Sequence, residues 1–243
     1  MLCARLADPL LDAAQVRSGS RVLDAGTGTG TVALLARERG ANVTGVDPDT
    51  DMLALARDKH AADRLAVAAL PALPFSDCAF DSVVANFVVN HVPDPRAAVA
   101  ELVRATRRGG TVAVSIWPYP TSPLHQLFTE VVRAADPVLP PTRRLPRELD
   151  FARTEDGLAA LLRGAGLTGV RAARVHWIHR VDPEVWWSGP AAGIAGFGEL
   201  LTSQSPAAAA RLKREYDRLS VRFLDAGKLA LPTSAVWAAG TRR

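Results

Sequence analysis

Residues 22–49 read VLDAGTGTGTVALLARERGANVTGVDPD and decide the fold of this chain. Three glycines follow one another at alternate positions between two aspartates, Asp24 and Asp47. A glycine cluster weakens any helix or strand that contains it, so this spacing indicates a close approach to the backbone that a Cβ atom would block. The segment therefore predicts a strand, a tight turn that faces a small ligand, and a helix.

Strands and helices alternate outward from this segment. A second buried strand is predicted over residues 41–47, after which helical periodicity resumes with Asp49 or Thr50 as the predicted N-cap. A third helix is predicted to begin with Asp94 as its cap and Pro95 in its first turn, and to end at residues 109–110. Strands that are separated by helices of this length indicate right-handed crossovers between parallel strands. We expect an α/β fold with a Rossmann-like, doubly wound, mostly parallel sheet of seven strands, the last antiparallel, and helical insertions after the fifth and sixth strands.

The chain is predicted to form one domain over residues 1–243, because α/β sheets of this length usually stay undivided. Residues 118–150 are rich in proline, which a simple crossover helix would not tolerate, and are predicted to be an insertion. Residues 182–230 are predicted to be a second insertion with helical stretches. The last strand is predicted over residues 234–240, and the two insertions are expected to cover a substrate.

Composition excludes several classes of protein. The formal charge is +4, but the arginines are spread along the chain and never form a run, so no nucleic-acid partner is expected. No stretch of 18 apolar residues is present, so no membrane span is expected. Cys3 and Cys78 lack metal-type spacing and no leader is recognisable, which predicts a cytoplasmic protein. His176 and His179 point to opposite faces of a predicted strand, so no metal site is expected.

The glycine turn differs from a dinucleotide-binding turn. The pattern G-x-G-x-x-G would need a glycine where Thr31 stands, which disfavours an NAD-dependent oxidoreductase. The pattern present is D-x-G-x-G-x-G. Amides near a helix start face an anionic group, and an acidic residue such as Asp47 at the tip of the second strand can accept both hydroxyls of a ribose. A ligand with a small zwitterionic head and a ribose is therefore predicted.

Four motifs in order carry a family resemblance. They are VLDAGTGTG, GVDPDTDML, ALPFSDCAFDSVVANFVVNHVPDP and ELVRATRRGGTVAVSIW. Over residues 22–117 the chain resembles a class I S-adenosylmethionine-dependent methyltransferase of the small-molecule, ubiquinone-methyltransferase-like (type 11) group. The resemblance implies S-adenosylmethionine as cofactor and methyl transfer to an O, N or C atom of a small lipophilic or aromatic metabolite. It also implies the cofactor-binding residues Asp24, Ala25, Gly26, Thr27, Gly28, Asp47, Pro48, Met52, Ala69, Leu70, Asn86 and Phe87.

One position departs from the family pattern. Ala69 stands where an acidic residue would accept a hydrogen bond from the adenine amino group, and one such bond is worth about 1.5–3 kcal/mol. We therefore expect weakened rather than abolished cofactor binding. Because of this departure, a second function is also considered. In it, the protein has the methyltransferase fold but does not transfer a methyl group, and serves as a cyclase-like catalyst or a ligand-binding module.

His91 is the candidate catalytic residue, because it follows the fourth strand and histidine can act as a base near neutral pH. A packing role for His91 is the alternative, and His125 is a weaker candidate. Trp117, Tyr119, Trp177, Trp186 and Trp187 lie in or near the insertions and could line an aromatic acceptor pocket or fill a core. A monomer or homodimer is expected.

Overall fold

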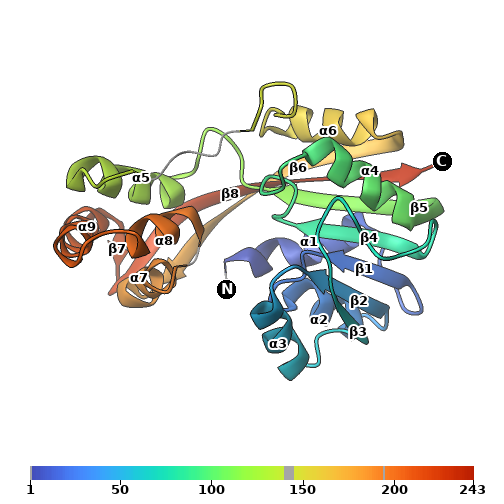
Figure 1. Cartoon of the computed structure of the whole chain (residues 1–243), viewed down its shortest axis with the longest axis horizontal. Helices are drawn as coiled ribbons and strands as arrows, with labels where there is room; N and C mark the ends of the chain where they lie inside the picture. The colour runs from blue at the N-terminus through green and yellow to red at the C-terminus, as the bar shows by residue number, and fades with distance from the viewer. Residues whose placement is uncertain (1, 140–144, 194) are drawn as a thin grey trace. The chain divides into compact units, whose positions relative to one another are not determined.

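The computed structural model describes residues 2–139, 145–193 and 195–243. Helices and strands alternate over residues 21–67 and again over residues 80–116, as the periodicity predicts, and Figure 1 labels the elements. In chain order the elements are η1 (Cys3–Leu6), α1 (Ala7–Ala13), β1 (Arg21–Ala25), α2 (Thr31–Glu38), β2 (Asn42–Asp47), α3 (Thr50–Asp58), β3 (Arg64–Val67), β4 (Phe80–Asn86), α4 (Pro95–Ala105), β5 (Thr106–Ile116), α5 (Pro123–Ala135), α6 (Glu155–Gly164), β6 (Leu167–Val181), α7 (Pro183–Ala191), α8 (Ala195–Thr202), α9 (Pro206–Ser220), η2 (Val221–Phe223), β7 (Leu224–Asp225) and β8 (Lys228–Arg242).

The chain divides into two compact units. Unit 1 comprises residues 1–119, 145–175 and 235–243, and unit 2 comprises residues 120–144 and 176–234. Residues 140–144 and 194, which fall within the two predicted insertions, lie outside the described residues. One domain with two insertions stays a prediction.

The sheet has the predicted doubly wound topology. Its strand order is β3-β2-β1-β4-β5-β8-β6, with β1 to β5 parallel, β8 antiparallel to β5, and the two-residue β7 as an eighth strand beside β8. One apolar core holds side chains of α4 and α6, and a second holds those of α1, α2 and α3. Unit 1 is therefore a sheet between two helical layers.

The predicted end of α4 is wrong. The helix stops at Ala105, and Gly109 and Gly110 lie within β5. The Thr106 hydroxyl donates to the carbonyl of Leu102 at 2.7 Å, and the register between β4 and β5 shifts next to the glycines. A Cβ on Gly110 would lie 2.6 Å from the carbonyl oxygen of Asp81, so the glycine allows this strand to pass its neighbour.

The end of the second predicted insertion also differs from expectation. Residues 224–230 belong to a hairpin in which β7 pairs with β8, and β8 begins before the predicted residue 234. Ala226 and Gly227 connect the strands with φ values of 49° and 77°. Positive φ at both central residues is the requirement of a tight hairpin turn, but alanine in the first of these positions gives a weak sequence signal.

Arg242, on the last strand, stabilises the end of α4. Its guanidinium donates towards the carbonyls of Val103, Arg104 and Thr106 at 2.8, 2.7 and 2.5 Å. A cation at a helix C-terminus satisfies carbonyls that lack helical partners and interacts favourably with the helix dipole.

We therefore expect Arg242→Ala to lower the free energy of unfolding by about 1–2 kcal/mol. Urea unfolding followed by circular dichroism measures this loss. Arg243→Ala is the matched control, since it removes the same charge from the exposed neighbouring residue. Equal midpoints for the two variants would contradict the assignment.

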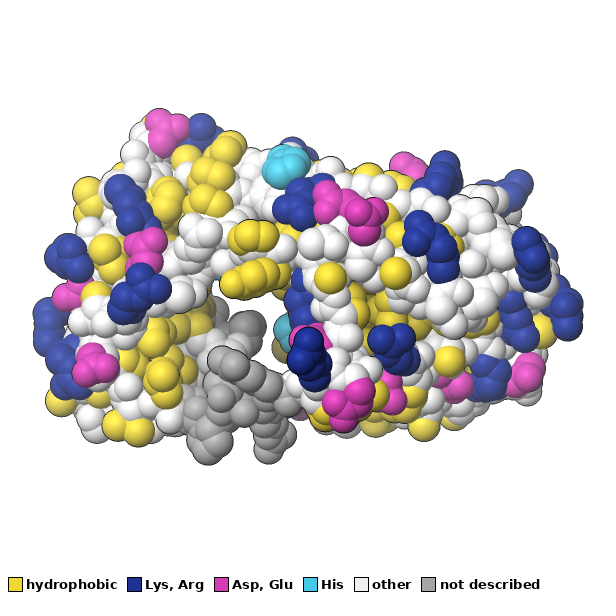
Figure 2. Space-filling view, turned by 90° about the horizontal axis from the view of Figure 1, so that it is seen from above, with side chains coloured by type: hydrophobic (Ala, Val, Ile, Leu, Met, Phe, Trp, Pro, Cys, Tyr) yellow, Lys and Arg dark blue, Asp and Glu magenta, His cyan; other side chains and the backbone are white. Residues whose placement is uncertain are grey.

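Charged side chains of both signs share the surface. On the face seen in Figure 2, Lys and Arg side chains are scattered, with Asp and Glu side chains among them. Several arginines pair with acids, as Arg39 does with Asp8 and Asp12, both at 2.6 Å. No helix in the described part of the chain is long and apolar enough to cross a membrane.

Candidate functional site

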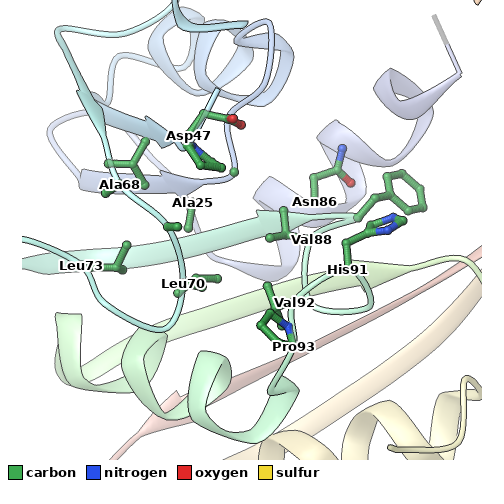
Figure 3. A pocket seen from close by; sticks show the side chains of 15 residues that line it. Ala25, Asp47, Ala68, Leu70, Leu73, Asn86, Val88, His91, Val92 and Pro93 are labelled. Carbon is green, nitrogen blue, oxygen red and sulfur yellow. The ribbon is translucent and has the colours of Figure 1, made fainter. Parts of the chain in front are cut away.

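A pocket of about 390 Å³ lies where β1, β2 and β4 end. The strand order reverses between β1 and β4, and such switch points are where open α/β sheets bind ligands. Figure 3 shows the labelled side chains around the pocket, with Asp47 on one side and Asn86 and His91 on another. The lining residues are Ala25, Gly26, Val46, Asp47, Pro48, Ala68, Ala69, Leu70, Leu73, Asn86, Phe87, Val88, His91, Val92 and Pro93.

A larger hollow of about 1050 Å³ lies at the other ends of the strands. It includes Arg21 and Asn42, the first residues of β1 and β2, and residues 74–76 of the connection between β3 and β4. That connection contains no helix, unlike the connections from β1 to β2, from β2 to β3 and from β4 to β5. The smaller pocket is the better candidate site, because it lies at the carboxyl ends of the strands.

Each of the three glycines has positive φ, but their surroundings differ. A Cβ on Gly26 would collide with the side chain of Val88, and one on Gly30 would collide with Ala61. A Cβ on Gly28 would meet nothing within 4 Å. The expectation that a ligand accounts for the bare backbone is therefore wrong for Gly30 and incomplete for Gly26, where the protein's own side chains need the space.

Asp47, the last residue of β2, lines the pocket and organises its rim. Its Oδ2 accepts from the backbone N–H of Gly28 at 2.8 Å, and its Oδ1 accepts from that of Asp49 at 3.0 Å. Asp49 in turn caps α3 by accepting from the N–H groups of Asp51 and Met52. Because each carboxylate oxygen has two lone pairs, Asp47 keeps capacity for further donors.

Asp24 lies beneath the glycine turn rather than in the pocket wall. It is 1% exposed, and its Oδ2 accepts from the Thr27 hydroxyl at 2.7 Å and from the N–H of Ala33 at 3.1 Å. Its Oδ1 is buried and has no hydrogen-bond partner among the described residues. Burial raises the pKa of Asp24 to about 6, although the two hydrogen bonds oppose that change.

The residues implied for the cofactor separate into two groups. Ala25, Gly26, Asp47, Pro48, Ala69, Leu70, Asn86 and Phe87 line the pocket, whereas Asp24, Thr27, Gly28 and Met52 do not. Sequence reasoning missed Val46, Ala68, Leu73, Val88, Val92 and Pro93. Each of these lies within three residues of a predicted site residue, but its apolar side chain is indistinguishable from ordinary core.

The wall formed by residues 68–73 is apolar. Ala68, Ala69, Leu70 and Leu73 contribute no side-chain donor or acceptor to the pocket. The carbonyl of Ala69 already accepts from the N–H of Ala72 at 2.9 Å. This wall therefore offers apolar contacts and no side-chain hydrogen bond.

His91 lines the pocket as a neutral base candidate. Burial, and then the charge of Arg153, lower the pKa of His91 below its usual value. Its Nε2 lies 3.3 Å from the amide nitrogen of Asn90. A neutral imidazole at the pocket can accept a proton near neutral pH.

The other histidines lie elsewhere. His125 is on α5 in unit 2, where burial lowers its pKa to about 4. His176 is exposed and His179 is partly buried, in line with opposite faces of β6. The described residues contain no group of three His, Cys, Asp or Glu side chains that could hold a metal ion.

The aromatic residues near the insertions are divided between the two units. Trp117 belongs to unit 1, where its ring stacks on Phe87 with centroids 4.0 Å apart, and Tyr119 is 69% exposed. In unit 2 the ring of Phe128 stacks with those of Trp186, Phe197 and Tyr216. Core packing accounts for these unit 2 contacts.

Comparisons with known proteins show what residues 23–114 are similar to. The sequence profile of the family described as "Methyltransferase domain" matches residues 23–114. The chain is 41% identical over 104 residues to malonyl-[acyl-carrier protein] O-methyltransferase of Pectobacterium atrosepticum. The aligned residues make up 43% of this chain and 41% of that protein. The chain is 32% identical over 131 residues to demethylmenaquinone methyltransferase of Renibacterium salmoninarum. The aligned residues make up 54% of this chain and 55% of that protein.

Solved structures share the fold over nearly the whole chain. The YcgJ protein of Bacillus subtilis superposes with a TM-score of 0.63 at 18% identity, over 98% of both chains. In contrast, the chain spans about half the length, or less, of the two named relatives. The sequence match and the shared fold coincide on the segment that builds the pocket. Residues 23–114 of this chain therefore match the methyltransferase domain family.

Proposed function

We propose that this protein binds S-adenosylmethionine in the pocket at the ends of β1, β2 and β4, and methylates an O, N or C atom of a small lipophilic or aromatic metabolite. The observation that carries the proposal is the carboxylate of Asp47, which lies at the tip of β2 with free acceptor capacity. A volume of 390 Å³ falls within the range of small-molecule sites, about 300–1,000 Å³.

The residues present fit the parts of this cofactor. Asp47 would accept from the ribose hydroxyls, while the apolar wall of Ala69 and Leu70 would pack against the base. The backbone of Ala25 and Gly26 would lie beside the amino-acid portion, with Asn86 and Phe87 near the sulfur. When bound, S-adenosylmethionine supplies a methyl carbon activated for displacement.

The protein's own contribution would be positioning, exclusion of water and acceptance of a proton. Displacement at an activated carbon chiefly needs alignment of the acceptor. For a hydroxyl acceptor, the neutral His91 imidazole would take the proton. The proposal further includes a cytoplasmic monomer or homodimer that acts on small molecules rather than on nucleic acid or at a membrane, and the free thiols of Cys3 and Cys78 support a reducing compartment.

Isothermal titration calorimetry with S-adenosylhomocysteine, S-adenosylmethionine and NADH tests the proposal. Binding of either sulfur compound is expected. Binding of NADH alone would indicate an oxidoreductase, and no binding of any of the three would overturn the cofactor assignment. Where binding is seen, incubation with S-adenosylmethionine and candidate aromatic acceptors, followed by mass spectrometry for a gain of one methyl group, tests the reaction.

The ribose role predicts that Asp47→Ala weakens S-adenosylhomocysteine binding by tenfold or more, about 1.4 kcal/mol. Asp49→Ala is the control, because it removes a neighbouring carboxylate that caps α3 and does not line the pocket. Loss of the cap costs stability of about 0.5–2 kcal/mol but leaves Asp47 in place. An Asp47→Ala protein that keeps the wild-type dissociation constant would refute the role.

A further inference from the structure

The side chain of Ser115 connects β5 with the end of β4. Ser115 is fully buried, and the N–H of Phe87 donates both to its Oγ at 3.0 Å and to its backbone carbonyl at 3.1 Å. The same hydroxyl donates to Oδ1 of Asn86 at 2.6 Å. Asn86 and Phe87 both line the pocket, whereas Ser115 does not. One hydroxyl beneath the pocket therefore holds two consecutive residues of its wall.

Phe87 needs such an anchor, because its backbone is in an unfavourable region. Its φ of 60° is left-handed, which is uncommon for a residue other than glycine and costs about 1–2 kcal/mol. In this conformation the Phe87 ring stacks on Trp117, and the following residue, Val88, packs over Gly26. Strained backbone that is held by its surroundings occurs preferentially at functional sites.

The hydroxyl of Ser115 also sets the orientation of the Asn86 amide. Since Ser115 Oγ receives the N–H of Phe87, its own proton is directed to Asn86 Oδ1. The Asn86 Nδ2 group then faces the opposite way and donates to the carbonyl of Cys3 at 3.2 Å. The hydrogen bonds of Ser115 thus extend through Asn86 to the N-terminal turn η1.

We propose that Ser115 is a positioning residue for the ligand pocket, which it shapes by fixing Asn86 and Phe87 and, through Asn86, the N-terminal turn. The identity of the ligand rests on the proposed function, whereas the positioning role rests on these hydrogen bonds alone. Alanine at this position removes the hydroxyl that donates to Asn86 Oδ1, and it leaves the N–H of Phe87 with the Ser115 carbonyl as its acceptor.

Ser115→Ala and Ser82→Ala form a matched pair. Ser82 is 3% exposed on β4, and its hydroxyl donates to the carbonyl of Ala14 at 2.8 Å, outside the pocket lining. Both variants lose one buried hydroxyl and are expected to lose similar thermal stability. Ser115→Ala alone should weaken S-adenosylhomocysteine binding by about tenfold and accelerate hydrogen exchange at the Phe87 amide and in residues 3–6.

Two readouts separate this proposal from the proposed function. If the wild-type protein binds no S-adenosylhomocysteine, the cofactor assignment fails, and faster exchange at Phe87 in Ser115→Ala alone still supports the positioning role. Wild-type exchange at Phe87 in Ser115→Ala overturns the positioning role. Equal losses of affinity in the two serine variants also overturn it, because they would reflect general destabilisation.

Discussion

Replacement of Gly26 by alanine is expected to reduce the affinity for S-adenosylhomocysteine by roughly 100-fold, about 2.8 kcal/mol. An added Cβ would collide with a methyl group of Val88, and both residues line the pocket. Well-packed regions do not absorb even one extra methyl group without displacing neighbours. Because Val88 follows the anchored Phe87, its displacement would distort the pocket wall. Calorimetric titration of the purified variant measures the effect.

Two further variants test whether the collision is the cause. Gly26→Ala combined with Val88→Ala removes the opposing methyl groups and should recover a large part of the lost affinity. Gly19→Ala introduces alanine at a similar φ, 79°, where a Cβ meets nothing within 4 Å. That control should lose about 1 kcal/mol of stability from backbone strain and keep its affinity. Wild-type affinity in the single Gly26→Ala variant would refute the packing role of Val88.

Asp24→Asn is expected to raise the free energy of unfolding at pH 7 by about 1–3 kcal/mol. The buried carboxyl has a pKa of about 6 in the folded protein, against an ordinary value of 3.8. A displacement of about two pH units corresponds to about 3 kcal/mol. The stabilisation from the bound proton is fully present below pH 3.8 and is lost as pH rises to about 6. A neutral amide of the same shape avoids that loss.

The measurement is urea unfolding of wild type and variant between pH 4 and 7. His125 changes the stability in the opposite direction between pH 4 and 7. Its pKa is about 4 in the folded protein, so the stability that it contributes above pH 6.5 is lost as the pH falls. The difference between the two curves removes this contribution, and it should grow from near zero at pH 4 to its full value above pH 6. A constant difference would contradict the raised pKa.

Asp81→Asn is the control of opposite sign. Partial burial would raise the pKa of Asp81, but hydrogen bonds from Arg21 and Arg107 lower it to about 2. Its charged form is therefore favoured in the folded protein, and the same substitution should decrease stability at pH 7. Increased stability in both asparagine variants would point to a general effect of removing negative charge.

Local features of the fold could be predicted from the sequence because they depend on neighbours along the chain. Asp49 and Asp94 cap their helices as predicted, with Pro95 in the first turn of α4. Alternating strands and helices implied the parallel doubly wound sheet, and the position of Asp47 at the end of the second strand placed it at the edge where the pocket lies. These inferences rest on chain periodicity and on the short range of capping hydrogen bonds.

Features that join distant residues needed the tertiary structure. The sequence determined by itself the α/β class, the glycine turn and the acidic residue at its rim. Only the tertiary structure decided that Val88 occupies the space above Gly26, that Ser115 holds Asn86 and Phe87, and that Asp24 is buried without a full set of partners. The physical reason is that packing and desolvation depend on contacts between residues that are distant in the sequence. Periodicity along the chain does not specify those contacts.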